Sequence, residues 1–134
     1  MGGYRIVKRE EAPDFMEQYP GFGEMRSFTE PAEAEQVAFT WRSMPPETGG
    51  RGSYGHRHHN QEEIYFVISG TVLFKLGDDV VEVGPHTVVR VSPEVYRSIH
   101  NDGPGPAELV ICSRRAAAGE AEVETTPDFW PDEG

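Results

Sequence analysis

The chain has 134 residues, of which 26% are charged and 37% hydrophobic, as is typical of one globular domain with its own core. Its formal net charge of −11 argues against a nucleic-acid partner, because phosphate binding needs a basic face. No apolar run is long enough to span a membrane, and no apolar signal-peptide segment follows the N-terminal basic residues. Cys112 is the single cysteine, so no disulfide can form within the chain. Since no export signal is recognised, we expect a cytoplasmic protein.

The first predicted strand follows an N-terminal extension, residues 1–36, of mixed character. Residues 37–44 alternate with period two, and Pro45-Pro46 ends this run. Phe39 and Trp41 share one face of the predicted strand, and we expect that face to pack in the core. A glycine-rich loop, residues 48–55, then leads into a cluster of histidines.

Beyond the histidines, short runs of β-branched and aromatic residues alternate with turn signals such as Gly77-Asp78-Asp79 and Gly84-Pro85. Together with the earlier runs they make roughly eight short strands, and no long amphipathic helix interrupts them. The pattern predicts a single all-β domain over residues 1–134, with a barrel core at about 37–113 whose closure protects the strand edges. The predicted strands in this part are residues 63–69, 71–76, 80–83, 87–91, 97–100 and 107–113.

An acidic C-terminal tail, residues 114–134, follows the last predicted strand. Residues 119–134 carry six acidic and no basic side chains, which is typical of a solvated tail. Phe129 and Trp130 lie within it. This aromatic pair allows two interpretations, docking on the barrel or a partner subunit, or fraying of the terminus.

The histidine cluster carries the residue types that bind metals. On a strand, His56 and His58 point to the same side while His59 points to the other, and Glu63 begins the next strand. Two imidazoles and a carboxylate that converge from adjacent strands form a facial triad, which suits a divalent transition metal with open coordination positions. We therefore predict that His56, His58 and Glu63 are metal ligands. Structural or exposed positions are expected for the other histidines: His59, His86 and His100.

This spacing resembles the first conserved motif of the cupin superfamily. The motif's anchor positions are matched by Gly50, His56, His58, Glu63 and Gly70. Residues 84–101 resemble the second cupin motif, with Pro93 and Asn101 near their expected places. The resemblance implies a double-stranded β-helix, or jelly-roll barrel. It also implies one divalent transition metal (Fe, Mn, Ni, Cu or Zn) and assembly as a homodimer.

The second motif departs from the cupin pattern at a metal-ligand position. Cupins usually carry a histidine four residues before the motif's asparagine, where this chain has Arg97. A guanidinium cannot ligate a metal and repels a divalent cation, so something anionic should lie between them. The nearby His100 faces the other way on a regular strand, and only a bulge would turn it inward.

Three arrangements satisfy this requirement for an anion. Glu63 pairs with Arg97 and no metal is bound, or a metal binds His56, His58 and Glu63 while Arg97 clamps a carboxylate or phosphate of a bound ligand. In the third, Arg97 turns to a carboxylate of the barrel wall and water completes the coordination. Tyr65 shares a strand face with Glu63 and is a candidate for substrate binding, with core packing as the alternative.

These observations predict a small metal-binding cupin that acts on or binds a small anionic organic molecule, for example as a mononuclear-metal oxygenase or an isomerase-like enzyme. The alternative is a non-catalytic, metal-free cupin that binds a metabolite through Arg97. A third hypothesis is an assembly protein that dimerises through its sheet edges and aromatic tail. The expected partners are a small-molecule ligand and a second copy of the chain, without nucleic acid or membrane. The substrate does not follow from the fold.

Overall fold

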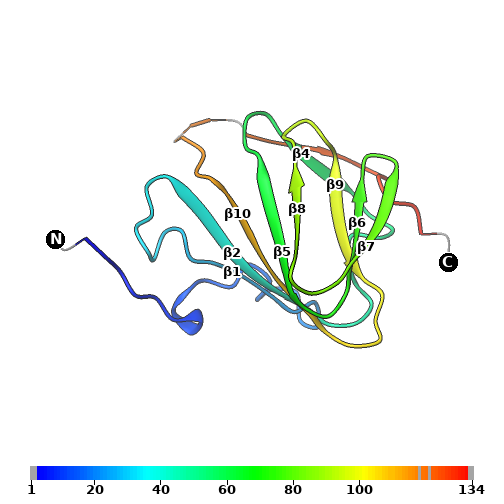
Figure 1. Cartoon of the computed structure of the whole chain (residues 1–134), viewed down its shortest axis with the longest axis horizontal. Helices are drawn as coiled ribbons and strands as arrows, with labels where there is room; N and C mark the ends of the chain where they lie inside the picture. Colours follow the sequence, from blue (N-terminus) through cyan, green and yellow to red (C-terminus); the bar gives the residue numbers. More distant parts are fainter. Residues whose placement is uncertain (1–2, 118, 121, 133–134) are drawn as a thin grey trace.

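A computed structural model describes residues 3–117, 119–120 and 122–132 of the chain. Within these residues one short 3-10 turn, η1 (Arg9–Glu11), accompanies eleven strands (Figure 1). No described helix is long and apolar enough to cross a membrane. The strands are β1 (Glu24–Ser27), β2 (Val37–Met44), β3 (Thr48–Gly49), β4 (Gly55–His58), β5 (Glu63–Ser69), β6 (Val72–Leu76), β7 (Asp79–Val83), β8 (Thr87–Val91), β9 (Arg97–Asn101), β10 (Ala107–Arg114) and β11 (Val123–Thr126).

The strands form two antiparallel sheets that pack against each other as a jelly roll (Figure 1). The first sheet has the order β1-β2-β10-β5-β8, and the second has the order β11-β4-β9-β6-β7 with β3 paired to β9. The predicted all-β double-stranded fold is therefore confirmed. Two strands come from outside residues 37–113, because β1 and β11 extend the outer edges of the two sheets.

The core lies between the two sheets and is built by strand alternation. Val67 and Leu109 of the first sheet meet Val72 and Phe74 of the second, and all four are fully buried. Neighbouring residues on the strands point outward, as Ile64 of β5 does with 40% of its surface exposed. Each buried side chain of this kind stabilises the fold by roughly 1.5–3 kcal/mol.

The inner face of β2 differs from the sequence prediction. Met44 is fully buried in the core, so its side of the strand faces inward. Phe39 and Trp41 lie on the opposite, outer face, and Phe39 is 38% exposed. Period-two alternation identifies the two faces of a strand without saying which one a second sheet will cover.

Two glycines of the first cupin-like motif are required by close backbone approaches. Gly70 has a φ of +75°, and a Cβ there would lie 2.4 Å from the carbonyl oxygen of Pro106. A Cβ on Gly50 would lie 1.8 Å from Ser98 Oγ. The motif glycines therefore allow the loop before β4 and the turn after β5 to pack against neighbouring strands.

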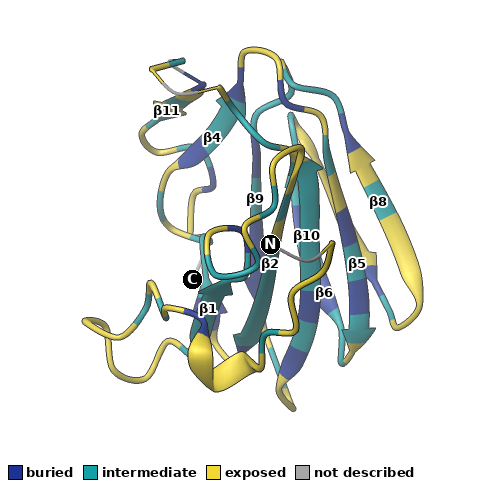
Figure 2. Ribbon diagram, turned by 90° about the vertical axis from the view of Figure 1, so that its left-hand side faces the viewer, coloured by how far each residue is buried: buried dark blue, intermediate teal, exposed yellow. Residues whose placement is uncertain are grey.

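The C-terminal tail docks on the barrel, which decides between the two interpretations of its aromatic pair. Strand β11 pairs with β4, from Val123↔His58 to Thr126↔Gly55. Trp130 is 5% exposed, and its ring packs edge-to-face on His100 with 5.9 Å between centroids. The tail thus forms the edge strand next to β4, the strand that carries the histidines (Figure 2).

Candidate metal centre and adjoining cavity

The fold brings the three predicted metal ligands together. His56 and His58 lie on β4 and Glu63 begins β5, and one ligand atom from each lies within 4.8 Å of the others. We call these three residues the triad. The β4–β9 pairing sets His56 opposite Arg97, so Arg97 enters the same site from the next strand.

The Glu63 carboxylate is the shared centre of the site. Its Oε1 accepts hydrogen bonds from the Tyr65 hydroxyl at 2.7 Å and from Arg97 Nη1 at 3.2 Å. Its Oε2 lies 3.3 Å from His58 Nε2, and His56 Nε2 lies 3.7 Å from Oε1. Burial acts to raise the pKa of Glu63, but the contacts with His56, His58 and Tyr65 outweigh it and hold this pKa well below its ordinary value. Glu63 is therefore an ionised carboxylate, the form that ligates metals.

His58 provides the test of whether these residues fit a metal. The side chain is 8% exposed, and neither ring nitrogen makes a hydrogen bond within the described part of the chain. The approach of Nε2 to Glu63 lacks hydrogen-bond geometry. A buried polar group without a partner costs about 1–3 kcal/mol. A metal on an imidazole nitrogen would remove that cost, so the donor set and the unpartnered His58 nitrogens fit a divalent transition metal.

Arg97 is fully buried and forms a hydrogen bond with the Glu63 carboxylate. Its Nη1 donates to Glu63, and its Nη2 donates to the carbonyl oxygen of Ser92 at 2.6 Å. The anion required between the guanidinium and a metal is therefore Glu63 itself. This contact is the one expected in the first of the three arrangements, in which Glu63 pairs with Arg97. It nevertheless leaves Oε2 of Glu63 facing His58 Nε2. Direct contact between Arg97 and a ligand stays a prediction.

Tyr65 is a fixed hydrogen-bond donor within the site. The residue is 3% exposed, and burial together with the Glu63 charge raises the pKa of its phenol well above the usual value. The hydroxyl therefore stays protonated and donates to Glu63. Tyr65 also borders the cavity described below, and its contact with a substrate stays a prediction.

The other histidines lie apart from the triad. His59 is exposed. His86 is also exposed, in the left-handed region with a φ of 63°, and its ring stacks on Phe66. His100 is 7% exposed and accepts a weak hydrogen bond from the Arg51 backbone at 3.4 Å. All three therefore have the structural or exposed positions expected of them.

A cavity of about 440 Å³ opens beside the triad. His56, Glu63 and Tyr65 form part of its wall. Phe15 and Phe22 are about half exposed, which places them at its rim. Apolar side chains are the largest group among the other described residues of the wall, so the cavity suits a small organic molecule better than a free ion. The apolar side chains of the wall are Phe15, Met16, Phe22, Met25, Ile99 and Ile111.

Sequence reasoning missed one charged residue of this cavity, Arg42. It lies on β2 two residues before the core residue Met44 and borders the cavity together with the triad's His56 and Glu63. The available signal was an arginine that shares a strand face with apolar residues. This pattern could be interpreted only once the structure showed which face of β2 points inward.

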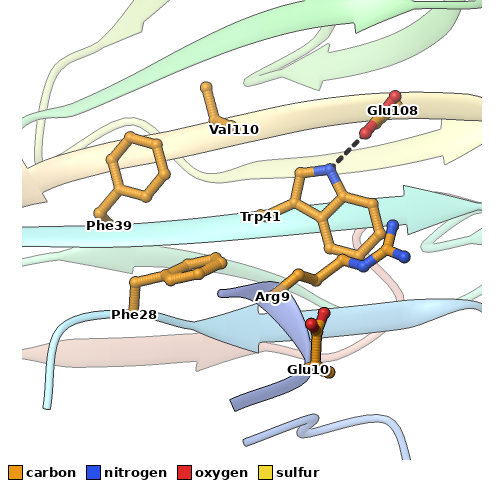
Figure 3. A pocket seen from close by; sticks show the side chains of 7 residues that line it. All are labelled: Arg9, Glu10, Phe28, Phe39, Trp41, Glu108 and Val110. Atoms are coloured by element: carbon orange, nitrogen blue, oxygen red, sulfur yellow. Dashed lines mark hydrogen bonds between the residues drawn. The ribbon is translucent and has the colours of Figure 1, made fainter. Parts of the chain in front are cut away.

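A second hollow, of about 340 Å³, lies on the outer face of the first sheet (Figure 3). Its polar groups already contact one another. Trp41 Nε1 donates to Glu108 at 2.6 Å, and the Arg9 guanidinium lies 5.0 Å from the centre of the Trp41 ring. No triad residue reaches this hollow, so the cavity beside the triad is the better candidate site.

Comparison with known families now places the chain. A family model for the cupin domain matches residues 43–113, which is more than half of the chain. The chain belongs to the cupin superfamily. This cupin is 31% identical over 58 residues to an uncharacterised protein of Methanocaldococcus jannaschii. That match covers 43% of this chain and 46% of the relative, so it spans less than half of the relative's length.

Solved structures share the cupin's fold. A cupin protein of Bacteroides fragilis has a TM-score of 0.69 at 16% identity, covering 90% of this chain and 92% of its own. The polyketide cyclase RemF of Streptomyces resistomycificus has a TM-score of 0.71 at 16% identity, with coverages of 93% and 85%. A predicted oxalate decarboxylase of Thermotoga maritima has a TM-score of 0.66 at 20% identity, with coverages of 84% and 100%. At these identities the likeness shows the fold alone.

Proposed function

We propose that this cupin binds one divalent transition metal at His56, His58 and Glu63 and acts on a small anionic organic molecule in the adjoining cavity. The observation that carries the proposal is buried His58, neither of whose ring nitrogens makes a hydrogen bond with a described residue, beside an ionised carboxylate and a second imidazole. The metals considered are Fe, Mn, Ni, Cu and Zn, since this mixed nitrogen and oxygen donor set suits them.

The surrounding residues have separate tasks in this proposal. Arg97 and Tyr65 hold the Glu63 carboxylate in place, as second-shell partners of metal ligands commonly do. The apolar side chains of the cavity wall pack against a bound organic molecule. The metal would supply Lewis acidity at the inner end of the cavity.

The reaction class in this proposal is an oxygenase or an isomerase-like activity. A triad with three protein ligands leaves coordination positions open for a substrate. The structural relatives named above include a polyketide cyclase and a predicted oxalate decarboxylase, so small-molecule chemistry on this fold is well represented.

Metal analysis of protein purified without a histidine tag tests the proposal. Wild-type protein should contain, or take up on reconstitution, about one metal per chain. His58→Ala should lose it, while the control His86→Ala should keep it because His86 lies apart from the triad. Less than about a tenth of an equivalent in the wild type, with no uptake, would contradict metal binding.

One observation favours a second candidate function, a metal-free binding protein for an organic anion. The Arg97–Glu63 ion pair already neutralises the carboxylate without a metal. The two candidates differ in what a chelator does. Ligand binding that is unchanged by EDTA, in a protein that takes up no metal, would support the binding protein over the enzyme.

A further inference from the structure

Arg42 places a guanidinium in the wall of the cavity. Among the residues that the structure describes, no carboxylate forms an ion pair with its guanidinium, and its Nε is buried without a hydrogen bond. Burial lowers the pKa of Arg42, with the phenols of Tyr65 and Tyr54 opposing this effect. A guanidinium nevertheless stays protonated in proteins, so a positive charge faces the cavity uncompensated.

Arg97, the other cation near the triad, cannot bind an anion in the cavity without losing its present hydrogen bonds. Arg97 is fully buried, bonded to Glu63 and to the backbone carbonyl of Ser92, and it does not border the cavity. Among the described residues of the cavity wall, Glu63 is the only carboxylate, and its Oε1 already accepts hydrogen bonds from Arg97 and Tyr65. The described part of the wall therefore carries an unpaired positive charge at Arg42.

A ligand anion is the group that would complete this site. An unpaired buried charge is unfavourable, and a bound anion removes that cost while forming charge-assisted hydrogen bonds. The planar fork of a guanidinium matches a carboxylate with two parallel hydrogen bonds. The apolar side chains around it, among them Met25 and Ile111, favour an apolar body attached to that anion over a highly charged phosphate ester.

We propose that Arg42 anchors the ligand's anionic group, and that the ligand is an organic monocarboxylate with an apolar or aromatic body. The ligand then spans the cavity from Arg42 toward the triad. Arg42 and Tyr65 line this cavity together with His56 and Glu63, and Tyr65 donates a hydrogen bond to Glu63. This substrate class refines the proposed function. It rests on that function only for the metal at the triad.

Calorimetric titration with a matched pair of probes tests the anchor. Phenylacetate and phenylacetamide have nearly the same shape and differ in charge. Wild-type protein should bind phenylacetate about tenfold or more tightly than phenylacetamide, the scale of a charge-assisted hydrogen-bond pair. Arg42→Met keeps an unbranched side chain without the guanidinium charge and should abolish this preference. Arg42→Lys should retain part of it.

Two controls separate this inference from the metal proposal. Arg90→Met removes an exposed arginine paired with Glu62 on the outer face and should leave both affinities unchanged. Each titration is run with EDTA and again with added zinc. A preference that depends on Arg42 in both conditions supports the anchor even when zinc is not taken up.

Three results would overturn the inference. They are equal affinity of wild-type protein for the two probes, no measurable binding of either at millimolar concentration, and an Arg42→Met variant that keeps the wild-type preference. Circular dichroism of the variant establishes that it is folded. A misfolded Arg42→Met variant leaves the decision to Arg42→Lys and the wild-type probe comparison, whose outcomes still support or overturn the anchor.

Discussion

At the scale of single residues, the candidate site depends on how one carboxylate is shared. Glu63 receives Tyr65 and Arg97 on one oxygen and faces His58 with the other. The local spacing of the histidines predicted which residues converge. It left the pairing of Arg97 with this carboxylate as one of three arrangements, because the contact joins β9 of one sheet to β5 of the other and depends on how the two sheets pack.

Removing the buried guanidinium should destabilise the metal-free protein. In Arg97→Met, the Glu63 carboxylate loses its buried cation, and breaking such a pair costs about 3–5 kcal/mol. Urea denaturation in the presence of EDTA measures the free energy of unfolding. Arg90→Met is the matched control, since its exposed partner Glu62 makes a surface pair worth about 0–1 kcal/mol. Equal losses in the two variants would show that the Arg97–Glu63 contact carries little stability.

At the scale of elements, β4 depends on the C-terminal tail. Glu122, just before β11, is 6% exposed and accepts hydrogen bonds from the backbone N–H groups of His59 and Asn60, each at 2.8 Å to Oε2. Arg114 also donates to its carboxylate, at 3.2 Å. The acidic tail, expected to be a solvated segment, therefore fixes the chain directly after the two histidine ligands.

Neutralising that carboxylate should loosen the end of β4. Glu122→Gln weakens hydrogen bonds to a charged acceptor, each of which is worth about 1.5–3 kcal/mol. We expect faster amide exchange at His59 and Asn60, seen by NMR, and weaker metal uptake at the triad. Glu124→Gln is the control, because its pair with Arg57 is exposed. Unchanged exchange at both amides would contradict a holding role for Glu122.

At the scale of the whole molecule, the outer face of the first sheet carries an apolar row across four strands. Cross-strand pairing aligns Trp41, Val110, Phe66 and Val88 in one row. Val88 is 55% exposed, and Figure 2 shows much of β8 as exposed. Contiguous apolar surface of this kind marks interaction sites on soluble proteins. We propose this face as the contact in the homodimer predicted from the sequence, since a flat sheet face can meet a second copy of itself about a two-fold axis.

A charge on this face should therefore disrupt assembly. Val88→Glu would bury a carboxylate in an apolar contact, which is strongly unfavourable without a partner. Light scattering coupled to size-exclusion chromatography should give a dimer for the wild type and a monomer for the variant at micromolar concentration. Val80→Glu places the same charge at a similarly exposed position on the second sheet and should leave the dimer intact. A monomeric wild type would contradict the proposal.

The sequence by itself determined the strand rhythm through local periodicity, and the spacing of His56, His58 and Glu63 predicted their convergence. The cupin fold was implied by the resemblance of that stretch to the first cupin motif. Only the tertiary structure decided which face of β2 points inward, and so placed Arg42 in the cavity wall. It also decided that Arg97 pairs with Glu63 and that the tail covers β4. The physical reason is that a two-residue period is the same for both faces of a strand. Pairing between distant strands depends on register, which no local segment contains.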